Sequence, residues 1–213
     1  LDIDEKSRLV RTQAGVLGPD LEKALSTWGF MLGHQPQSIS ISTVGGWIST
    51  RAIGQLSVRY GAIEDLVAGM EVVLPSGQAA RSKVVPRSSV GPDVASLMIG
   101  SEGTLGIVTE ATLRVSPLPE ARFDRCIRFE HMADGVAACR KIVQAGLQPT
   151  LLRLYDREDV SIFMRAIEGE SHDPMLLLSF EGARADVRAE EAVALSRGSR
   201  GDDALVEHWW QHR

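Results

Sequence analysis

The sequence predicts an α+β protein of two domains, and three observations lead to this prediction. The second half of the chain alternates strand and helix patterns, as in a sheet with helices on one face. The first half carries glycine-bearing stretches among short strands, at 40–54 and 97–115. The linker Pro117-Leu118-Pro119 separates the two halves. We therefore expect one domain at 1–118 and another at 119–213.

The first domain is expected to begin with a short strand at 8–14. A helix then starts at Gly18-Pro19-Asp20, because proline suits the first helical position and aspartate suits the positive end of the helix dipole. Gly29 is expected to end this helix. Helical spacing predicts an apolar face made of Leu21, Ala24, Leu25 and Trp28.

A β-hairpin is predicted in the middle of the first domain. Strand patterns at 68–74 and 78–82 flank Pro75-Ser76-Gly77, whose residue types favour a tight turn. Gly91-Pro92-Asp93 then opens a short helix at 94–98. In the second domain, apolar patterns predict strands at 123–129, 150–155 and 175–181, and helices at 132–144, 156–166 and 184–196.

The stretch at 97–115 combines a glycine-rich loop with a strand. Gly100, Gly103 and Gly106 recur every third residue, and the polar residues between them offer partners to a ribose or an amide. From Ile107 the pattern alternates, so that Ile107 is expected to share a face with Leu113. A dinucleotide turn of Rossmann type has a strand before its glycines and a helix after them, whereas the order here is reversed. The loop is therefore either a nucleotide site built from backbone or a tight structural turn.

The stretch at 40–54 allows two interpretations of its adjacent Gly45 and Gly46. In the first, a loop leads into a buried helix that places Trp47 and Ile48 in the core. In the second, a cofactor phosphate lies against the backbone amides beside the glycines. The phosphate interpretation would be assisted by the hydroxyl groups of Thr43, Ser49 and Thr50 and by the fixed positive charge of Arg51.

Composition excludes several classes of function. The 213 residues carry a net charge of −5, which gives no general attraction to nucleic acid. No apolar run approaches the roughly 20 residues that cross a bilayer. Cys126 and Cys139 suggest buried reduced thiols rather than a disulfide framework, and a cytoplasmic enzyme fits these features.

The histidines do not predict a metal centre. His208 and His212 have the spacing of two ligands on one helix, but a third ligand is lacking and the tryptophans between them suggest packing. His34, His131 and His172 stand alone and are expected on the surface or in loops. We therefore expect no metal.

Four segments resemble the alkylglycerone-phosphate synthases, which belong to the FAD-binding family of vanillyl-alcohol oxidase type. They are S-T-V-G-G-W-I-S-T-R-A at 42–52, G-A-I-E-D-L-V at 61–67, G-P-D at 91–93 and G-S-E-G-T-L-G-I-V-T-E-A-T at 100–112. The wider family, including FAD-linked D-lactate dehydrogenases and glycolate oxidase subunits, shares G-S-E-G-T-L-G-I. The resemblance implies the second FAD-binding subdomain of this fold, followed by part of an α+β cap domain.

The resemblance also implies which residues bind FAD. One group is expected at the pyrophosphate and flavin, and another toward the ribose and adenine. The first group is Gln37, Ser38, Ile39, Ser40, Ile41, Ser42, Thr43, Thr50, Arg51, Ala52 and Ile53, and the second is Glu102, Gly103, Thr104, Leu105, Gly106, Ile107 and Val108. Arg153 falls where the synthases carry an arginine implicated in activity, so it is expected to act on an anionic substrate group or on the flavin. An arginine ion-paired at a domain interface is the alternative.

In the family, a first phosphate-loop segment precedes the part that matches Leu1, and a catalytic tyrosine and a His-rich segment follow the part that matches Arg213. The chain also begins without Met. We therefore expect a central fragment of a longer protein.

The implied reaction exchanges the acyl group of acyl-glycerone phosphate for a fatty alcohol, giving an ether lipid precursor without net redox change. An FAD-linked oxidoreductase that oxidises a 2-hydroxy acid such as lactate or glycolate is the alternative. A cofactor-free fragment or binding module is a second alternative, because the phosphate loop is missing. The expected partner is a small or lipid-like substrate and not nucleic acid, while peripheral membrane contact and a homodimer stay open.

Overall fold

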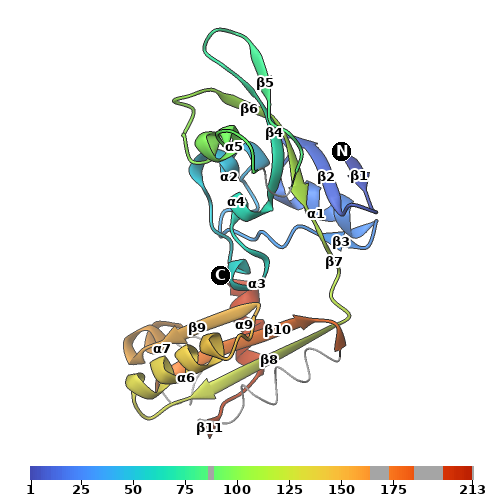
Figure 1. Cartoon of the computed structure of the whole chain (residues 1–213). Coiled ribbons are helices and arrows are strands. Elements are labelled where there is room, and N and C mark those ends of the chain that lie inside the picture. The colour runs from blue at the N-terminus through green and yellow to red at the C-terminus, as the bar shows by residue number, and fades with distance from the viewer. Residues whose placement is uncertain (86–88, 164–172, 185–198, 213) are drawn as a thin grey trace. The chain divides into compact units, whose positions relative to one another are not determined.

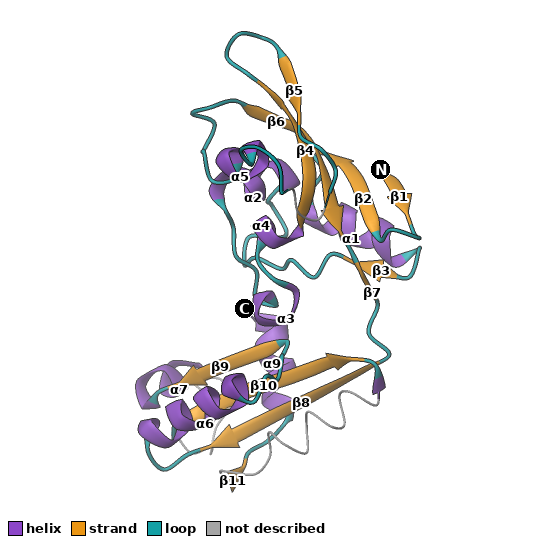
Figure 2. Cartoon of the chain, in the orientation of Figure 1, coloured by secondary structure: helices purple, strands orange, loops and turns teal. Residues whose placement is uncertain are grey.

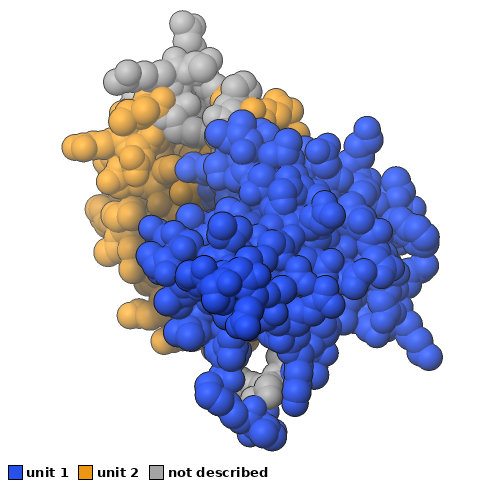
Figure 3. Space-filling view, turned by 90° about the horizontal axis from the view of Figure 1, so that it is seen from above, with its two compact units in different colours: residues 1–118 blue, residues 119–213 orange. Residues whose placement is uncertain are grey.

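A computed structural model describes the protein at residues 1–85, 89–163, 173–184 and 199–212. The chain divides into two compact units, Leu1–Leu118 and Pro119–Arg213, which are coloured separately in Figure 3. Each unit combines an antiparallel sheet with helices, so the prediction of an α+β fold is confirmed. None of the helices that the structure describes has the length and apolar character needed to cross a membrane.

A five-stranded sheet organises unit 1, in the order β1-β2-β6-β4-β5 (Figure 1). Its strands are β1 Asp2–Asp4, β2 Leu9–Gln13, β4 Val67–Val73, β5 Ala79–Arg81 and β6 Ile107–Arg114. A separate pair joins β3 Phe30–Met31 to β7 Ser116–Pro117. The helices are α1 Gly18–Ser26, α2 Val44–Thr50, α3 Ser57–Tyr60, α4 Ile63–Leu66 and α5 Val94–Met98. The predicted hairpin is β4 and β5, and the predicted short helix after Asp93 is α5.

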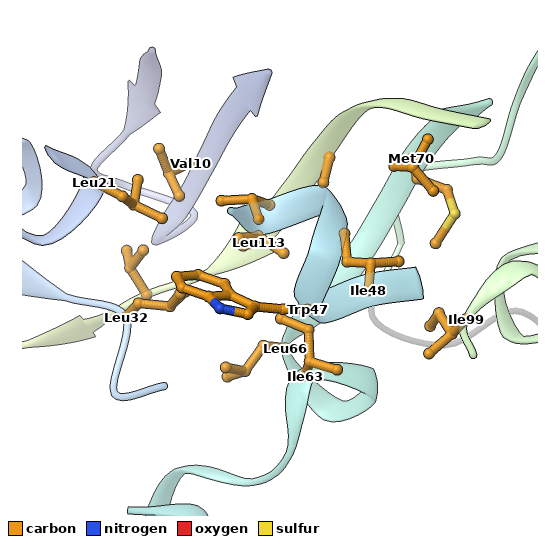
Figure 4. Packing of buried hydrophobic residues seen from close by; sticks show 14 of the residues in the cluster. Val10, Leu21, Leu32, Trp47, Ile48, Ile63, Leu66, Met70, Ile99 and Leu113 are labelled. Carbon is orange, nitrogen blue, oxygen red and sulfur yellow. The ribbon is translucent and has the colours of Figure 1, made fainter. Parts of the chain in front are cut away.

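The core of unit 1 is built around α2 (Figure 4). Trp47 and Ile48 are 2% and 0% exposed, so the prediction that they enter the core is confirmed. They pack with Val10, Leu21, Leu32, Ile63, Leu66 and Leu113 from the surrounding elements. Trp28, in contrast, was wrongly predicted on the apolar face of α1, because the helix ends at Ser26 and leaves this side chain 55% exposed.

A bulge in β6 changes the side to which Ile107 points. Glu71 pairs with Glu110 and Val72 pairs with Val108, so Thr109 is an extra residue on β6. The alternation is therefore reversed beyond Thr109, and Val108 is buried while Ile107 is 69% exposed. The expectation that Ile107 shares the buried face of Leu113 is wrong for this reason.

A four-stranded sheet in the order β11-β8-β10-β9 forms the centre of unit 2 (Figure 2). Its strands are β8 Ala121–Arg128, β9 Leu151–Tyr155, β10 Met175–Gly182 and β11 Ser199–Arg200. The helices are α6 Met132–Gln144, α7 Arg157–Phe163 and α9 Ala204–His212. Residues 164–166 and 185–196, part of two predicted helices, lie outside the described residues.

The helices of unit 2 cover both faces of its sheet. Ile142 of α6 packs with one buried cluster, which includes Leu178 and Phe180, whereas Trp209 of α9 packs with another, which includes Leu177. The expectation of helices on one face is therefore wrong. The physical reason lies in β10, whose residues from Met175 to Phe180 are all buried and leave no polar face for water.

Candidate functional site

The two glycine-bearing stretches of unit 1 meet at one groove. A hollow of about 310 Å³ lies between the start of α2 and the loop before β6. Of the residues predicted from the sequence, Thr43, Gly103, Gly106, Ile107 and Val108 line it. Gly45, Gly46 and Ser49, which belong to the phosphate interpretation of 40–54, also line it, together with Ala14 and Gly15. Local sequence pattern gives no signal for Ala14 and Gly15, because they join the groove through a contact between distant segments, in which Gly45 N donates to the Ala14 carbonyl.

The α2 side of the groove has no backbone amide left for a phosphate among the first four residues of the helix. Each of these amides already donates a hydrogen bond inside the protein. Gly45 N donates to the Ala14 carbonyl at 2.8 Å, and Gly46 N donates to Thr43 Oγ1 at 3.2 Å. The amides of Val44 and Trp47 donate to Val16 O and Thr43 O. The phosphate interpretation of Gly45 and Gly46 is therefore not supported at these amides.

The loop side of the groove offers open backbone instead. Gly103 has φ +79°, and a Cβ placed on it would find no atom within 4 Å. Within the described part of the chain, the amides of Gly103 and Leu105 make no hydrogen bond. Ile107 adds an exposed apolar side chain beside them. This combination of free donors, accessible backbone and apolar surface fits a ligand such as FAD, which has polar links and flat rings.

The remaining predicted FAD residues lie outside this lining. Gln37 to Ile41 form a turn, in which Ile41 is 80% exposed. Ser42 accepts a hydrogen bond from the buried Trp47 indole, at 2.7 Å between Nε1 and Oγ. Ala52 packs against the core, and Thr50 Oγ1 donates to the Gly46 carbonyl. Ile53 and Thr104 are exposed, and Thr104 Oγ1 donates to Ser101 O.

Arg51 and Glu102 share an unusual backbone conformation. Their φ values are 52° and 49°, in the left-handed region that ordinary residues seldom adopt. The two residues also lie at one junction, since Glu102 N donates to the carbonyl of Ser49, near the end of α2. Strained backbone of this kind is concentrated at ligand sites, and here it borders the groove.

His34 is buried, contrary to the expectation of a surface residue. Its side chain is 0% exposed and its ring meets that of Trp47 at 4.9 Å between centroids. Neither ring nitrogen has a hydrogen-bond partner among the described residues. Burial lowers the pKa of His34 to about 4, so the ring is neutral at pH 7.

Arg153 lies on β9 in unit 2, whereas the residues that line the groove all belong to unit 1. Its guanidinium carbon is 5.2 Å from the ring centroid of Trp209 and 5.9 Å from that of Tyr155. The Trp209 indole donates to the Tyr155 hydroxyl at 2.6 Å, which fixes both rings. Aromatic faces attract a guanidinium, so these rings restrict where it can point.

No group of three or more His, Cys, Asp or Glu side chains suited to a metal occurs within the described residues. His131 is exposed, with its Nε2 atom 3.8 Å from Oε1 of Glu130, and His172 lies outside the described residues. His208 lies on α9. Cys126 is buried and Cys139 half-buried, and neither forms a disulfide bond among the described residues.

Two family models match the chain. Residues 1–83 match the model described as FAD binding domain, and residues 118–213 match the model described as FAD linked oxidases, C-terminal domain. Together these matches extend over most of both units.

Individual proteins match as well. The chain is 43% identical to alkyldihydroxyacetonephosphate synthase of Caenorhabditis elegans over 73% of its own length and 26% of the relative. It is 34% identical to a D-lactate dehydrogenase of Anaerostipes hadrus over 85% of the chain and 40% of that protein. A solved alkyldihydroxyacetonephosphate synthase superposes on all of the chain with a TM-score of 0.82 at 28% identity, and the match covers 45% of that structure. The chain thus spans less than half the length of these proteins.

Proposed function

This chain belongs to the family of FAD-linked oxidases, and we propose that it is part of an enzyme that exchanges the acyl group of acyl-glycerone phosphate for a fatty alcohol. FAD is the cofactor of the family, and the groove of unit 1 suits it. When bound, FAD supplies the reactive flavin ring; the protein supplies position and charge.

One observation carries the proposal: two segments that match the synthases, around Thr43 and around Gly103, come together at a single groove. The open amides of Gly103 and Leu105 would donate to polar oxygens of FAD. Ile107 would cover an apolar ring, because the bulge at Thr109 turns its side chain outward. The other FAD contacts that we propose are the turn at 37–43, the residues Thr50, Ala52 and Ile53, and the segment 102–108.

Arg153 is proposed to bind the phosphate of the substrate. A guanidinium matches the geometry of phosphate oxygens and keeps its charge at all physiological pH values. The rings of Tyr155 and Trp209 lie close to this guanidinium and would restrict where it can point. The acyl and alkyl chains would require apolar surface beyond these residues.

Oxidation of a 2-hydroxy acid is the second candidate function, favoured by the likeness to D-lactate dehydrogenase. Arg153 could then bind a carboxylate instead of a phosphate. The two functions differ in what they do to the flavin, because only the oxidation leaves it reduced.

An anaerobic visible spectrum of the full-length gene product separates the candidates. We expect a bound-flavin spectrum that a panel of 2-hydroxy acids does not bleach. Bleaching by one of them would favour the oxidoreductase and contradict the proposed exchange. Purified, refolded protein that takes up no flavin would contradict both functions and favour the cofactor-free module.

A further inference from the structure

The end of α2 and the loop before β6 are joined by backbone hydrogen bonds. Gly100 N donates to the Ile48 carbonyl at 2.9 Å, and Glu102 N donates to the Ser49 carbonyl at 3.0 Å. Carbonyls at a helix C-terminus lack their usual i+4 partners, and these two amides help to satisfy them, although Ile48 O also accepts from Arg51 N at 3.3 Å. The loop that carries Gly103 is thereby attached to the helix that forms the opposite wall of the groove.

Arg51 stands at this junction. It is the left-handed residue that ends α2, a position that glycine usually fills. Its guanidinium donates from Nη2 to the Ile99 carbonyl at 3.2 Å. A Cβ placed on Gly100 would lie 3.3 Å from both Cβ and Nε of Arg51, so the stem of the arginine lies along the loop backbone.

We propose that Arg51 is a positioning residue, whose side chain holds the Ile99–Glu102 backbone against α2 and so fixes the distance between the two walls of the FAD groove. The inference rests on the proposed function only in taking FAD as the ligand of the groove. It assigns Arg51 a role through Ile99 and Gly100 rather than through a direct bond to an FAD phosphate.

Both roles are chemically available to an arginine, and the structure favours the first. The bond to Ile99 and the contact with Gly100 are made within the protein and already place the Arg51 side chain on the loop. Arg51 is also an exposed residue, as a direct contact with FAD would require. The two roles differ in the FAD-free protein, where only a positioning role makes the loop backbone depend on the Arg51 side chain.

Arg51→Gly removes the side chain and keeps the left-handed backbone conformation. Glycine adopts a φ of 52° without strain, so the fold should be preserved while the side-chain contacts are lost. Arg51→Lys restores a charged donor on a flexible stem. Arg8→Gly is a matched control, because Arg8 is also exposed and left-handed, at φ 53°, but lies in the turn between β1 and β2.

The experiment measures amide hydrogen exchange of the full-length gene product without FAD, and then FAD affinity by flavin fluorescence. In Arg51→Gly, we expect the Gly100 and Glu102 amides to exchange about threefold to tenfold faster, and the Kd for FAD to rise about fivefold. Arg51→Lys should recover part of both effects. Arg8→Gly should change neither.

Unchanged exchange in Arg51→Gly would overturn the proposal, whether or not FAD affinity falls. Weaker FAD binding with unchanged exchange would instead indicate direct contact with FAD. If the wild-type protein bound no FAD, the proposed function would fail, while the exchange of Gly100 and Glu102 would still test whether Arg51 holds the loop.

Discussion

Gly106 passes so close to Val73 that a Cβ on Gly106 would lie 2.8 Å from the Val73 carbonyl oxygen. This contact presses the end of the glycine loop onto β4, next to the groove. Gly106→Ala should therefore force the backbone apart and lower the free energy of unfolding by about 1–3 kcal/mol. Urea unfolding of the FAD-free protein measures this change, and an unaltered midpoint would contradict the close contact.

Gly103→Ala should behave differently, because a Cβ there would enter open space at the groove. The left-handed φ of +79° costs alanine about 1 kcal/mol of stability. The added methyl would also occupy space that we assign to FAD. For each variant, the loss of FAD binding free energy is divided by the loss of unfolding free energy. We expect this ratio to be larger for Gly103→Ala than for Gly106→Ala. Equal ratios for the two variants would argue against FAD at Gly103.

Ser42 is expected to act through Trp47. Ser42→Ala would leave the buried indole N–H without its acceptor, at a cost of about 1–3 kcal/mol in the free energy of unfolding. Ser40→Ala, at an exposed position in the neighbouring turn, serves as the control. Equal stability of the two variants would show that the Ser42–Trp47 bond contributes nothing.

His34 should make the protein sensitive to acid. Its pKa is about 4 in the folded state against 6.5 when unfolded, so the unfolded state takes up the proton first as the pH falls. Stability is then lost between about pH 6.5 and pH 4, by about 3 kcal/mol in total. His34→Phe should remove this loss and flatten the dependence of unfolding free energy on pH.

Glu22 contributes with the opposite sign, because burial raises its pKa and stability is gained as that carboxylate takes up a proton. This contribution is common to wild type and His34→Phe, so it cancels in their difference. Parallel pH profiles for the two proteins would contradict the burial of a neutral His34.

Substitution of Arg153 should lower the turnover of substrate and leave the binding of FAD unchanged. Arg153→Met removes the proposed phosphate contact, so kcat/KM should fall about 30-fold or more while FAD affinity stays unchanged. Arg122→Met is the control, since Arg122 also stacks on a tryptophan of unit 2, with its guanidinium carbon 4.7 Å from the Trp210 ring centroid. Equal activity of the two variants would remove Arg153 from the site.

The sequence allowed prediction of the elements whose signals are local. Asp93 begins α5 as expected, and the helix predicted at 132–144 has the bounds of α6. The motifs around Thr43 and Gly103 also identified two segments that lie at one groove. For the two helices, residue type and spacing were enough, because a helix depends on neighbours in sequence, whereas the two groove segments were identified through the family resemblance.

The features that escaped prediction depend on contacts between distant segments. The outward orientation of Ile107 follows from the pairing of β6 with β4. The register of two paired strands cannot be deduced from the sequence of either strand alone. His34 is buried by the Trp47 region, which follows it in the chain. The amides of Gly45 and Gly46 meet acceptors on Ala14 and Thr43, so glycines that resembled a phosphate site are used in packing.

The central claim is tested most directly by product analysis of the flavin-loaded, full-length gene product. It would be incubated anaerobically with acyl-glycerone phosphate and a fatty alcohol, and both released fatty acid and ether would be quantified. The account predicts one fatty acid released for each ether formed, with no net reduction of the flavin. Absence of ether, together with flavin reduction by a 2-hydroxy acid, would contradict it.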